Sequence, residues 1–446
     1  MRRGVRRRPQ SRYYVKQMLT RRRFLPILSF PAAAASIAQA QRREAALPSL
    51  PPDSPILKLK SRRGEATPIT VDERRARIVR AQDLMQESKI DAICLTGGTS
   101  LEYFGAIRWG QSERLFAMVV PAKGDPFFVS PAFEEDRARE QIALGPGGKD
   151  PRVLVWQEDE SPYARVAAGL RERGITTGTI GIEETVKFVF SDGIAKAVPA
   201  LKVTSATPVT AGCRMVKTQH EINLMRLASR VTLQAYEAAW RSLRDGMTQN
   251  EFAGLVAAAH SRLGFSGGAG VQVAEFSALP HGSATPQVIR EGTILLIDGG
   301  CQVDGYHSDI SRTFVLGKPS DKMKKVFDIV HRAQSAALAA ARPGIACQDV
   351  DAAARKVVAE AGYGPNYNYF THRVGHGMGM DGHEWPYLVR GNALKLAPHM
   401  VFSDEPGVYI RGEFGVRLED DMHITENGAE LFTPQSPSLE NPFATA

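Results

Sequence analysis

Five side chains of the types that bind hard divalent cations gather in the last third of this 446-residue chain. Four are carboxylates and one is an imidazole, namely Asp298, Asp309, His376, Glu405 and Glu419. Oxygen-rich ligand sets of this kind suit Mn²⁺ and similar ions. Two such ions about 3.5 to 4 Å apart can hold a shared water, lower its pKa toward about 7 and polarise a carbonyl. The residue types therefore predict a site for a pair of divalent ions, which could activate a water in this way.

The two aspartates are predicted to lie on neighbouring strands. Asp298 ends an apolar run in GTILLIDGG, and Asp309 follows eleven positions later in HSDISRTF. The dipeptide Asp304-Gly305 lies between them and is typical of a tight hairpin turn. A hairpin at this turn brings the two carboxylates together.

The two glutamates are predicted to face each other across a second hairpin. Glu405 in SDEPGVYI and Glu419 in VRLEDD lie seven residues before and after Gly412, in a stretch rich in turn formers. Side chains opposite each other in an antiparallel pair are about 5 Å apart. Because like charges repel at that distance, a cation is expected between them. A metal ion is the simplest candidate.

The region around these residues is repeated within the chain. The first copy contains Arg244, Gly246, Gly264 and Phe265, and the pattern recurs 98 positions later as Arg342, Gly344, Gly362 and Tyr363. Further along, His281 corresponds to His383, and Asp298 corresponds to Glu405. A duplicated half-domain relates its strands by a pseudo-twofold axis, so matching acidic residues are expected to meet at one central site. The period is too long for a solenoid, whose repeats run to about 20 to 50 residues.

Six short motifs occur in a fixed order along the same region. They are ALPHG at 278–282, IDGG at 297–300, SDISRTF at 308–314, HRVGHGMGMDGHE at 372–384, DEPGVYI at 404–410 and VRLED at 416–420. In this order and spacing they resemble the pita-bread metallopeptidases, the family of Xaa-Pro aminopeptidases, prolidases and methionine aminopeptidases. Upstream, roughly residues 70–210 are similar to the creatinase-type N-terminal domain of the prolyl members, which methionine aminopeptidases lack.

The resemblance implies how the five candidate ligands divide between two ions. Asp298 would chelate one ion, His376 and Glu405 would bind the other, and Asp309 and Glu419 would bridge both. Mn²⁺ is favoured, with Co²⁺, Zn²⁺ or Fe²⁺ as alternatives, because a single imidazole does not select a soft ion.

Further residues are implied to act on the water and the substrate. The residues in these roles are Glu405 for the proton of the water, and His281, His372 and His383 for the substrate and its tetrahedral intermediate. For His372 a purely structural role is an equal alternative. Arg417 lies two residues from Glu419 on the same strand face and is expected to support that carboxylate.

The activity implied is removal of the N-terminal residue from peptides whose second residue is proline. Proline forms a tertiary amide without an N–H, so these bonds need a dedicated pocket. Dipeptides and longer peptides are both open as substrates. A dipeptidase needs a cation for the nearby C-terminal carboxylate, and Arg390 is the candidate. The alternatives are a non-peptidase hydrolase or lyase of small amides or amino-acid derivatives on this fold, and a non-catalytic binding protein.

Composition fits an enzyme of two domains, because a chain with 43% hydrophobic residues can bury two cores. An α/β creatinase-like domain is expected over residues 70–210, and an α+β pita-bread catalytic domain with the internal duplication over residues 211–446. The net charge of +8 comes from residues 1–40, which hold nine arginines and one lysine but no acid. The remainder is slightly negative and implies no nucleic-acid surface. The four cysteines show no paired spacing and are expected to be buried thiols.

Residues 1–40 are expected to be a twin-arginine signal peptide. The sequence TRRRFL at 20–25 leads into an apolar stretch of about fifteen residues and an A-x-A pattern at 38–40. That stretch is shorter than the ~20 residues that span a bilayer. The expectation is transient engagement of the twin-arginine machinery, cleavage near Ala40, a periplasmic or secreted enzyme, and a homodimer. Met18 is an alternative start, and a basic disordered tail is the alternative interpretation.

Local patterns predict the elements that position these residues. After a Pro-rich linker or arm over 41–69, helical patterns cover 73–87 and 165–173, and strand patterns cover 91–95, 115–120, 153–156 and 179–182. Residues 218–221 and 248–251 match capping boxes and begin predicted helices. His220, His260 and His331 are assigned to helix surfaces. At 398–400 the chain has Pro-His-Met where relatives usually carry Pro-Gly-Met, which leaves the local turn open.

Overall fold

The computed structural model describes residues 50–443 of the chain. The predicted signal peptide lies outside the described residues. Within residues 50–443, no helix has both the length and the apolar character needed to cross a membrane.

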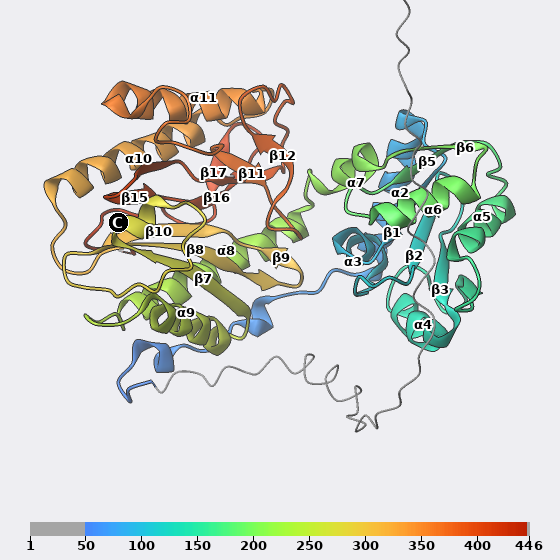
Figure 1. Ribbon diagram of the computed structural model, residues 1–446, viewed down its shortest axis with the longest axis horizontal. Coiled ribbons are helices and arrows are strands. Elements are labelled where there is room, and N and C mark those ends of the chain that lie inside the picture. The colour runs from blue at the N-terminus through green and yellow to red at the C-terminus, as the bar shows by residue number, and fades with distance from the viewer. Residues whose placement is uncertain (1–49, 444–446) are drawn as a thin grey trace, which may run out of the picture. The chain divides into compact units, whose positions relative to one another are not determined.

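The N-terminal domain is a mixed six-stranded sheet with helices packed against it (Figure 1). Its strands are β1 Ala92–Thr96, β2 Ala117–Pro121, β3 Phe127–Pro131, β4 Arg152–Trp156, β5 Gly178–Ile182 and β6 Leu201–Ser205, in the order β4-β3-β2-β1-β5-β6. The helices are α2 Val71–Ser88, α3 Thr99–Gly105, α4 Glu135–Ala143, α5 Pro162–Glu172, α6 Phe188–Ala197 and α7 Thr207–Arg214, with a 3₁₀ turn η3 at Ala132–Glu134. The central strands β1, β2 and β3 are buried at every residue, so they read as continuous apolar runs.

The elements predicted for this domain are confirmed to within three residues at each end, the largest difference being the start of α5 at Pro162 instead of residue 165. The strands β3 and β6 and the helices α3, α4, α6 and α7 were not predicted. The β3 sequence FFVSP is a short apolar run without period-two alternation, and such runs cannot be assigned from periodicity alone. The edge strand β6 is half-exposed and gives no clear apolar signal.

The catalytic domain consists of two similar halves. The first contains α8 Gln219–Trp240, α9 Gln249–Leu263, β7 Ser266–Val273, η4 Ala274–Ala278, β8 Ile294–Val303, β9 Tyr306–His307 and β10 Ile310–Val315. The second contains α10 Asp321–Ala340, α11 Cys347–Val358, a π-helical turn η5 Ala359–Tyr363, β11 Gly375–Gly377, β12 Glu384–Leu388, β13 Val401–Asp404, β14 Gly407–Ile410, β15 Phe414–Arg417, β16 Asp420–Ile424 and β17 Ala429–Leu431.

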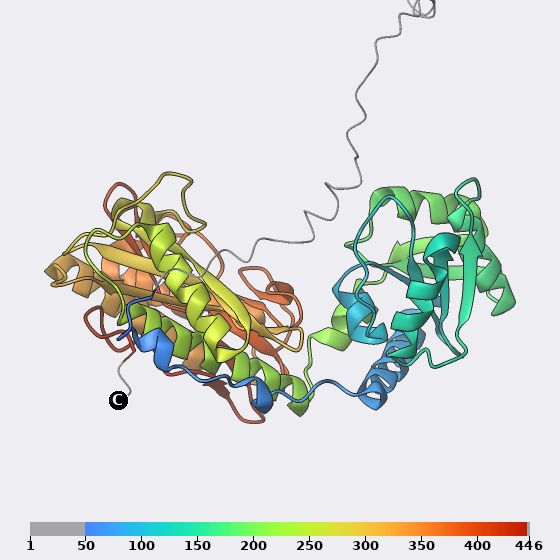
Figure 2. The same cartoon turned by 90° about the horizontal axis from the view of Figure 1, so that it is seen from below.

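Helices cover both outer faces of the catalytic sheets. In Figure 1 α10 and α11 lie on one side of the strands, and α8 and α9 lie on the other. Figure 2 shows the second of these layers from below, where α9 packs on β7. The sheets run in the orders β10-β8-β7 and β12-β11-β13-β16-β17, with β14 and β15 as a separate hairpin. Residues on their inner faces therefore lie between two helical layers.

The predicted duplication is confirmed at the level of the backbone. Gly246 and Gly344 both have φ of 85°, and Gly264 and Gly362 have φ of 93° and 91°. These left-handed values explain the glycines, since other residues adopt them at a cost. Isolated bridges also repeat, joining Thr248 to Val288 in the first half and Ala346 to Lys395 in the second. Equivalent residues 98 positions apart thus occupy equivalent places.

The helix caps and the histidines outside the site follow the sequence with one exception. Thr218 and Thr248 each form a complete capping box with the glutamate three residues on. His220 bonds Glu73, and His331 stacks on an aromatic ring of its own helix. His260 was expected on a helix surface, but it is fully buried and bonds the carbonyl of Val256 at 2.9 Å. The prediction for His260 is wrong because the apolar face of α9 includes this position.

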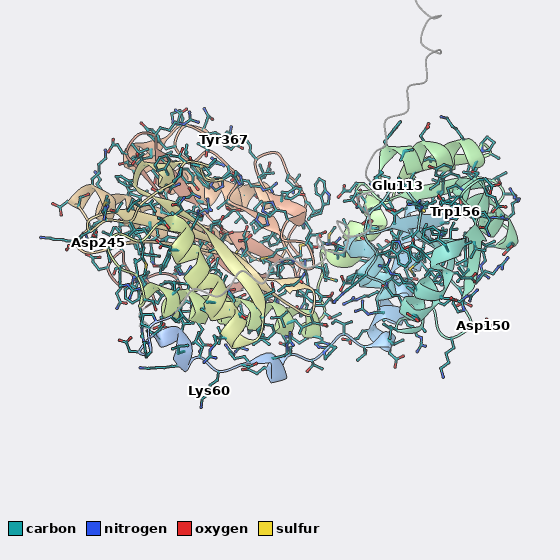
Figure 3. The ribbon with its side chains drawn as sticks, turned by 60° about the horizontal axis from the view of Figure 1, so that its bottom comes forward. Lys60, Glu113, Asp150, Trp156, Asp245 and Tyr367 are labelled. Atoms are coloured by element: carbon teal, nitrogen blue, oxygen red, sulfur yellow. The ribbon has the colours of Figure 1, made fainter. Side chains whose placement is uncertain are left out.

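Residues 50–69 form an arm on the catalytic domain before the chain enters α2. Ile56, in the 3₁₀ turn η1 Pro55–Lys58, is fully buried. Beyond it, η2 Arg63–Glu65 follows a bond of 2.8 Å from the Arg62 amide to the carbonyl of Leu263 at the end of α9. Lys60 points away from the domain (Figure 3). One face of the arm is therefore packed and the other is solvated.

The turn at Pro398-His399-Met400 is formed without a glycine. His399 has φ of 68°, its amide donates to the carbonyl of Ile424 at 2.8 Å, and its carbonyl accepts from the amide of Lys217 at 3.0 Å. Its ring nitrogen Nδ1 is buried without a hydrogen-bond partner among the described residues. The backbone conformation explains why glycine suits this position.

We predict that His399→Gly stabilises the protein by about 1 kcal/mol. The left-handed backbone costs a non-glycine residue roughly 1 to 2 kcal/mol, which exceeds the extra flexibility that glycine gives the unfolded chain. The midpoint of urea unfolding measures the change. As a control, Lys395→Gly at a residue without positive φ should destabilise. A lower midpoint for His399→Gly would contradict the assignment of strain.

Candidate active site

The two aspartates lie on adjacent strands, as predicted. Strand β8 pairs with β10 so that Asp298 faces Ser311, and Asp309 lies just before β10. The turn uses Asp304 and Gly305 with φ of 47° and 88°, the positive values of a tight hairpin. The chain therefore reverses where the sequence indicated, and both carboxylates reach the same cavity.

The two glutamates also occupy facing positions. In the β14–β15 hairpin Gly407 pairs with Arg417, and in the next ladder Asp404 pairs with Asp420. Both ladders share one register, so Glu405 and Glu419 face each other in the gap between them. The backbone amides of the two glutamates do not pair with each other's strands. The amide of Glu405 donates to the carbonyl of Val374 at 2.8 Å, and that of Glu419 donates to the carbonyl of Ser311 at 3.2 Å.

His376 is held in one orientation by its backbone surroundings. A Cβ on the neighbouring Gly375 would lie 2.0 Å from the carbonyl oxygen of Ser403, so this close approach requires glycine. The Nδ1–H of His376 donates to the carbonyl of Gly377 at 3.1 Å, which leaves Nε2 unprotonated. Nε2 lies 3.4 Å from Glu405 Oε1, and it is the ring nitrogen that can bind a cation.

The structure brings all nine predicted site residues to one cavity of about 360 Å³. They are His281, Asp298, Asp309, His372, His376, His383, Glu405, Arg417 and Glu419, joined in the lining by Pro280, Arg373 and Val389. Their possible ligand atoms form three overlapping groups, and within each group these atoms lie within 4.8 Å of one another. These groups are Asp298–Asp309–Glu419, His376–Glu405–Glu419 and Asp309–His376–His383.

The acids of the cavity repel one another. Burial, followed by the charges of neighbouring acids, holds the pKa of Asp309 and of Glu419 well above their usual values. Burial also raises the pKa of Glu405 to about 7, against the opposing effect of Arg417. Cations between the carboxylates would remove this penalty. The donor set of four carboxylates and one neutral imidazole therefore fits a pair of divalent ions.

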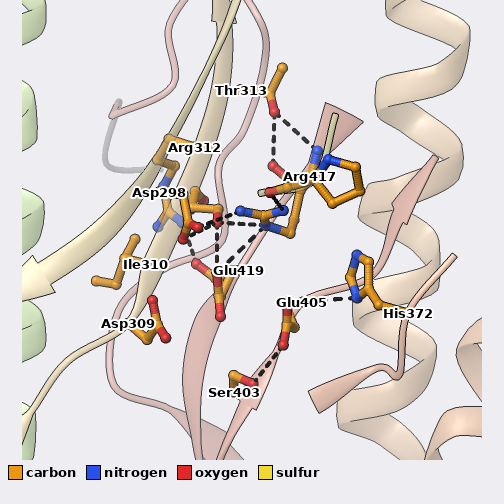
Figure 4. A network of polar contacts seen from close by, with 12 residues as sticks. Asp298, Asp309, Ile310, Arg312, Thr313, His372, Ser403, Glu405, Arg417 and Glu419 are labelled. Carbon is orange, nitrogen blue, oxygen red and sulfur yellow. Dashed lines mark hydrogen bonds and ion pairs between the residues drawn. The ribbon is translucent and has the colours of Figure 1, made fainter. Parts of the chain in front are cut away.

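Arg417 forms its strongest contact with Asp298, which differs from the prediction. Nη2 lies 2.6 Å from Asp298 Oδ2, whereas Nε lies 3.8 Å from Glu419 (Figure 4). Support for Glu419 passes through Ser311, whose Oγ accepts from Arg417 Nε at 2.9 Å and donates to Glu419 Oε2 at 2.6 Å. Asp298 lies on β8, whereas Arg417 lies on β15. This contact between different strands could not be inferred from spacing along one strand.

His372 is fixed from both ring nitrogens. Its Nδ1–H donates to the carbonyl of Arg373 at 2.8 Å, and its Nε2 accepts from the hydroxyl of Tyr409 at 2.7 Å. The same hydroxyl accepts from Arg417 Nη1 at 3.1 Å. Burial lowers the pKa of His372 to about 3, so the ring is neutral. The chain Arg417–Tyr409–His372 favours the positioning role for His372.

Two residues of this network, Ser311 and Tyr409, were missed in the sequence. Ser311 could have been found, because it lies two residues beyond Asp309 and side chains two apart share a strand face. Tyr409 lies within the motif DEPGVYI, but nothing in its spacing indicates a contact with His372.

Arg373 lines the cavity beside the predicted catalytic residues. Its Nη2 donates to His383 Nδ1 at 3.3 Å, and its guanidinium covers the ring of Tyr387 at 4.1 Å. No carboxylate of residues 50–443 forms an ion pair with it. Arg390, the predicted cation, instead bonds Asn366 at 3.2 Å and lines a different cavity. Arg373 therefore replaces Arg390 as the candidate.

The cysteines are free and buried, which confirms their prediction. Cys301 lies near Asp298 in the sequence, but its sulfur contacts the carbonyl of Ala228 at 3.4 Å. Burial raises the pKa of its thiol to about 11. Cys301 therefore stays protonated and takes no part in the acidic cluster.

Comparison with known proteins agrees with this geometry. Residues 223–426 match metallopeptidase family M24, and residues 77–216 match the creatinase/prolidase N-terminal domain. The chain is 36% identical over 360 residues to the probable dipeptidase PepE of Mycobacterium tuberculosis (strain ATCC 25618 / H37Rv), covering 79% of this chain and 92% of that protein. The chain belongs to metallopeptidase family M24. It is therefore a peptidase, and the family implies divalent metal ions.

Other relatives match this chain over most of its length. The Xaa-Pro dipeptidase of Lactobacillus helveticus is 32% identical over 80% of this chain and 97% of its own length. The crystal structure of the dipeptidase PepE from Mycobacterium ulcerans matches with a TM-score of 0.78 at 32% identity, over 84% of this chain and 99% of that one. The pita-bread fold with a creatinase-type N-terminal domain is thus confirmed.

We predict that His383→Ala lowers kcat by about 10² and leaves the metal content unchanged. His383 stacks on His376 with ring centroids 3.7 Å apart, but its Nδ1 faces Arg373, so we expect it to contact the substrate. Losing one positioned proton donor costs about this factor. Metal analysis beside peptide hydrolysis measures both effects. A variant that binds fewer ions would instead make His383 a ligand.

Proposed function

We propose that this M24 peptidase is an Xaa-Pro dipeptidase that uses two divalent ions, with Mn²⁺ favoured. Support comes from relatives named Xaa-Pro dipeptidase at about a third identity and from a cavity that gathers all nine predicted catalytic and ligand residues. The single observation that carries the dipeptide assignment is the guanidinium of Arg373 at this cavity, which forms no ion pair with a carboxylate of residues 50–443.

Five side chains would hold the ions. Asp298 would bind one, His376 and Glu405 would bind the other, and Asp309 and Glu419 would bridge both. When bound, the ions supply an acidified water and polarise the scissile carbonyl. The unprotonated Nε2 of His376 and the crowded carboxylates are already arranged as donors.

Glu405 is the residue that takes the proton of the attacking water. Its carboxyl lines the cavity beside the other four candidate ligands, so it is placed to accept a proton from a water held by the ions. Ser403 donates to Glu405 Oε1 at 3.3 Å and fixes the direction of the carboxylate. The neutral ring of His372 lies 3.7 Å from Glu405 Oε2 and adds no charge.

Substrate recognition depends on the residues at the rim of the cavity. In a dipeptide the C-terminal carboxylate follows the scissile bond by one residue, so a cation must lie close to the catalytic groups. Arg373 contacts His383 directly and therefore lies at such a distance. His281 and His383 are the exposed imidazoles of the lining and would orient the peptide.

We predict that Arg373→Ala lowers kcat/KM for Xaa-Pro dipeptides by about 10 to 10², the range for one charge-assisted hydrogen bond. Dipeptides with an amidated C-terminus should be cleaved equally by wild type and variant, because they lack the carboxylate. Arg390→Ala is the matched control and should behave as wild type, since Arg390 lines another cavity. Faster cleavage of Xaa-Pro-Xaa tripeptides than of dipeptides would indicate an aminopeptidase, and cleavage of only non-prolyl substrates would contradict the proposal.

We further propose that the enzyme is exported in the folded, metal-loaded state and acts as a homodimer in the periplasm or outside the cell. A ligand set of one imidazole and four carboxylates has little preference for manganese over zinc or copper, so the metal must be chosen by availability during folding. Export through the twin-arginine machinery allows this, because it moves folded proteins.

Replacing Arg21 and Arg22 with lysine should retain active, metal-loaded enzyme in the cytoplasm. Cell fractionation with a prolyl peptidase assay measures the distribution, and light scattering on the purified enzyme measures assembly. Continued export of the lysine variant would mean a signal of another type.

A further inference from the structure

Glu384 follows His383 directly and is a buried carboxylate with two cationic partners. Its side chain is 7% exposed, its Oε1 accepts from Lys217 Nζ at 2.8 Å, and its Oε2 pairs with Arg214 Nη2. Although burial raises it, the charges of Arg214 and Lys217 bring the pKa of Glu384 below its usual value. The group is therefore ionised and fully paired.

A second acid on the other side of His383 binds the same arginine. Asp381 Oδ2 lies 2.6 Å from Arg214 Nη2, the same nitrogen that pairs with Glu384. The other oxygen of Asp381 accepts from the hydroxyl of Thr99 at 2.5 Å. Arg214 thus pairs with Asp381, two residues before His383, and with Glu384, the residue after it. It links both ends of the short segment that carries the imidazole.

Close packing limits other arrangements of this segment. A Cβ on Gly379 would lie 2.6 Å from Glu384 Oε1, so the carboxylate lies directly against the backbone. The pairing of β11 with β12 shifts register between His376 and Gly377, and Glu384 faces Gly377 at this irregularity. His383 stacks on His376, and the acids that pair with Arg214 and Lys217 lie on either side of His383 in the sequence. Asp381, Glu384, Arg214 and Lys217 together form the acid clamp.

We propose that Arg214 and Lys217, by holding Asp381 and Glu384, are the positioning residues of His383. This inference rests on the proposed function. His383 is exposed, and within residues 50–443 its side chain has one hydrogen bond, from Arg373, so its placement depends on the backbone of residues 381–384. A catalytic group displaced by about 1 Å can lose 10² in rate.

The clamp also connects the N-terminal domain to the catalytic residue. Arg214 is the last residue of α7, and its Nη1 lies 3.5 Å from the hydroxyl of Ser100, which bonds Glu183 at the end of β5. Thr99 and Ser100 begin α3. A domain that contributes no side chain to the cavity therefore holds the segment on which His383 lies.

The test is a double-mutant cycle on the metal-loaded, full-length enzyme with an Xaa-Pro dipeptide. Glu384→Gln and Asp381→Asn should each lower kcat by about tenfold, change KM less than twofold and leave the metal content unchanged. In a His383→Ala background the same substitutions should have no further effect on kcat, because they act through His383. A purely structural role would lower kcat in both backgrounds.

A second buried ion pair between the same two domains provides the matched control. Arg77 pairs with Glu221 at 3.0 Å with side chains 6% and 3% exposed, and neither lines the cavity. Glu221→Gln should lose unfolding stability as Glu384→Gln does while keeping kcat. If Glu384→Gln does not fold, Asp381→Asn decides, because that side chain is 40% exposed and less costly to alter.

Each outcome has one meaning. Wild-type kcat for folded Asp381→Asn and Glu384→Gln, an undiminished effect in the His383→Ala background, or an equal loss in Glu221→Gln would overturn the inference. A wild-type enzyme without prolyl dipeptidase activity would instead overturn the proposed function, and then the clamp would be tested on whichever peptide the enzyme does cleave.

Discussion

Repulsion among carboxylates that share one cavity is the constraint on which this structure depends. Asp298, Asp309, Glu405 and Glu419 line that cavity, and burial together with neighbouring acids raises the pKa of Asp309, Glu405 and Glu419. Two hairpins force them together: one turns at Asp304-Gly305, and the other keeps one register on both sides of the facing glutamates. Arg417 offsets part of the charge, and the remainder is what two divalent ions would neutralise. The acids are therefore kept together at a cost to folding that bound metal ions would offset.

The residues around the acids fix the orientation of the catalytic side chains rather than their charge. Nδ1 of His376 is occupied by a carbonyl, His372 is held from both nitrogens, and Ser311 joins Arg417 to Glu419. These contacts fix tautomers and rotamers, so that little reorganisation is needed when substrate binds. The clamp behind His383 extends the same principle to the N-terminal domain, which then contributes to catalysis through position alone.

Much of the site could be predicted because it depends on short-range rules. Turn residues set both hairpins, the period of two along a strand places alternate side chains on one face, and the duplicated glycines keep the same φ in both halves. The rest depended on contacts between distant segments. The sequence does not reveal that Arg373 lines the cavity while Arg390 does not, since the irregular segments around β11 and β12 decide it. Arg417 was predicted to support Glu419, but its shortest contact with an acid is with Asp298 on β8. His260 was predicted on a helix surface, but it is buried because α9 packs against both α8 and β7.

The central claim is that the acidic cavity holds two divalent ions. Anomalous diffraction at the manganese edge from crystals grown with Mn²⁺ tests it most directly. The account predicts two peaks between the facing carboxylates, both within bonding distance of Asp309 and Glu419, with Asp298 on one ion and His376 and Glu405 on the other. An empty cavity in fully active crystals, or a single ion that Asp309 and Glu419 do not share, would contradict it.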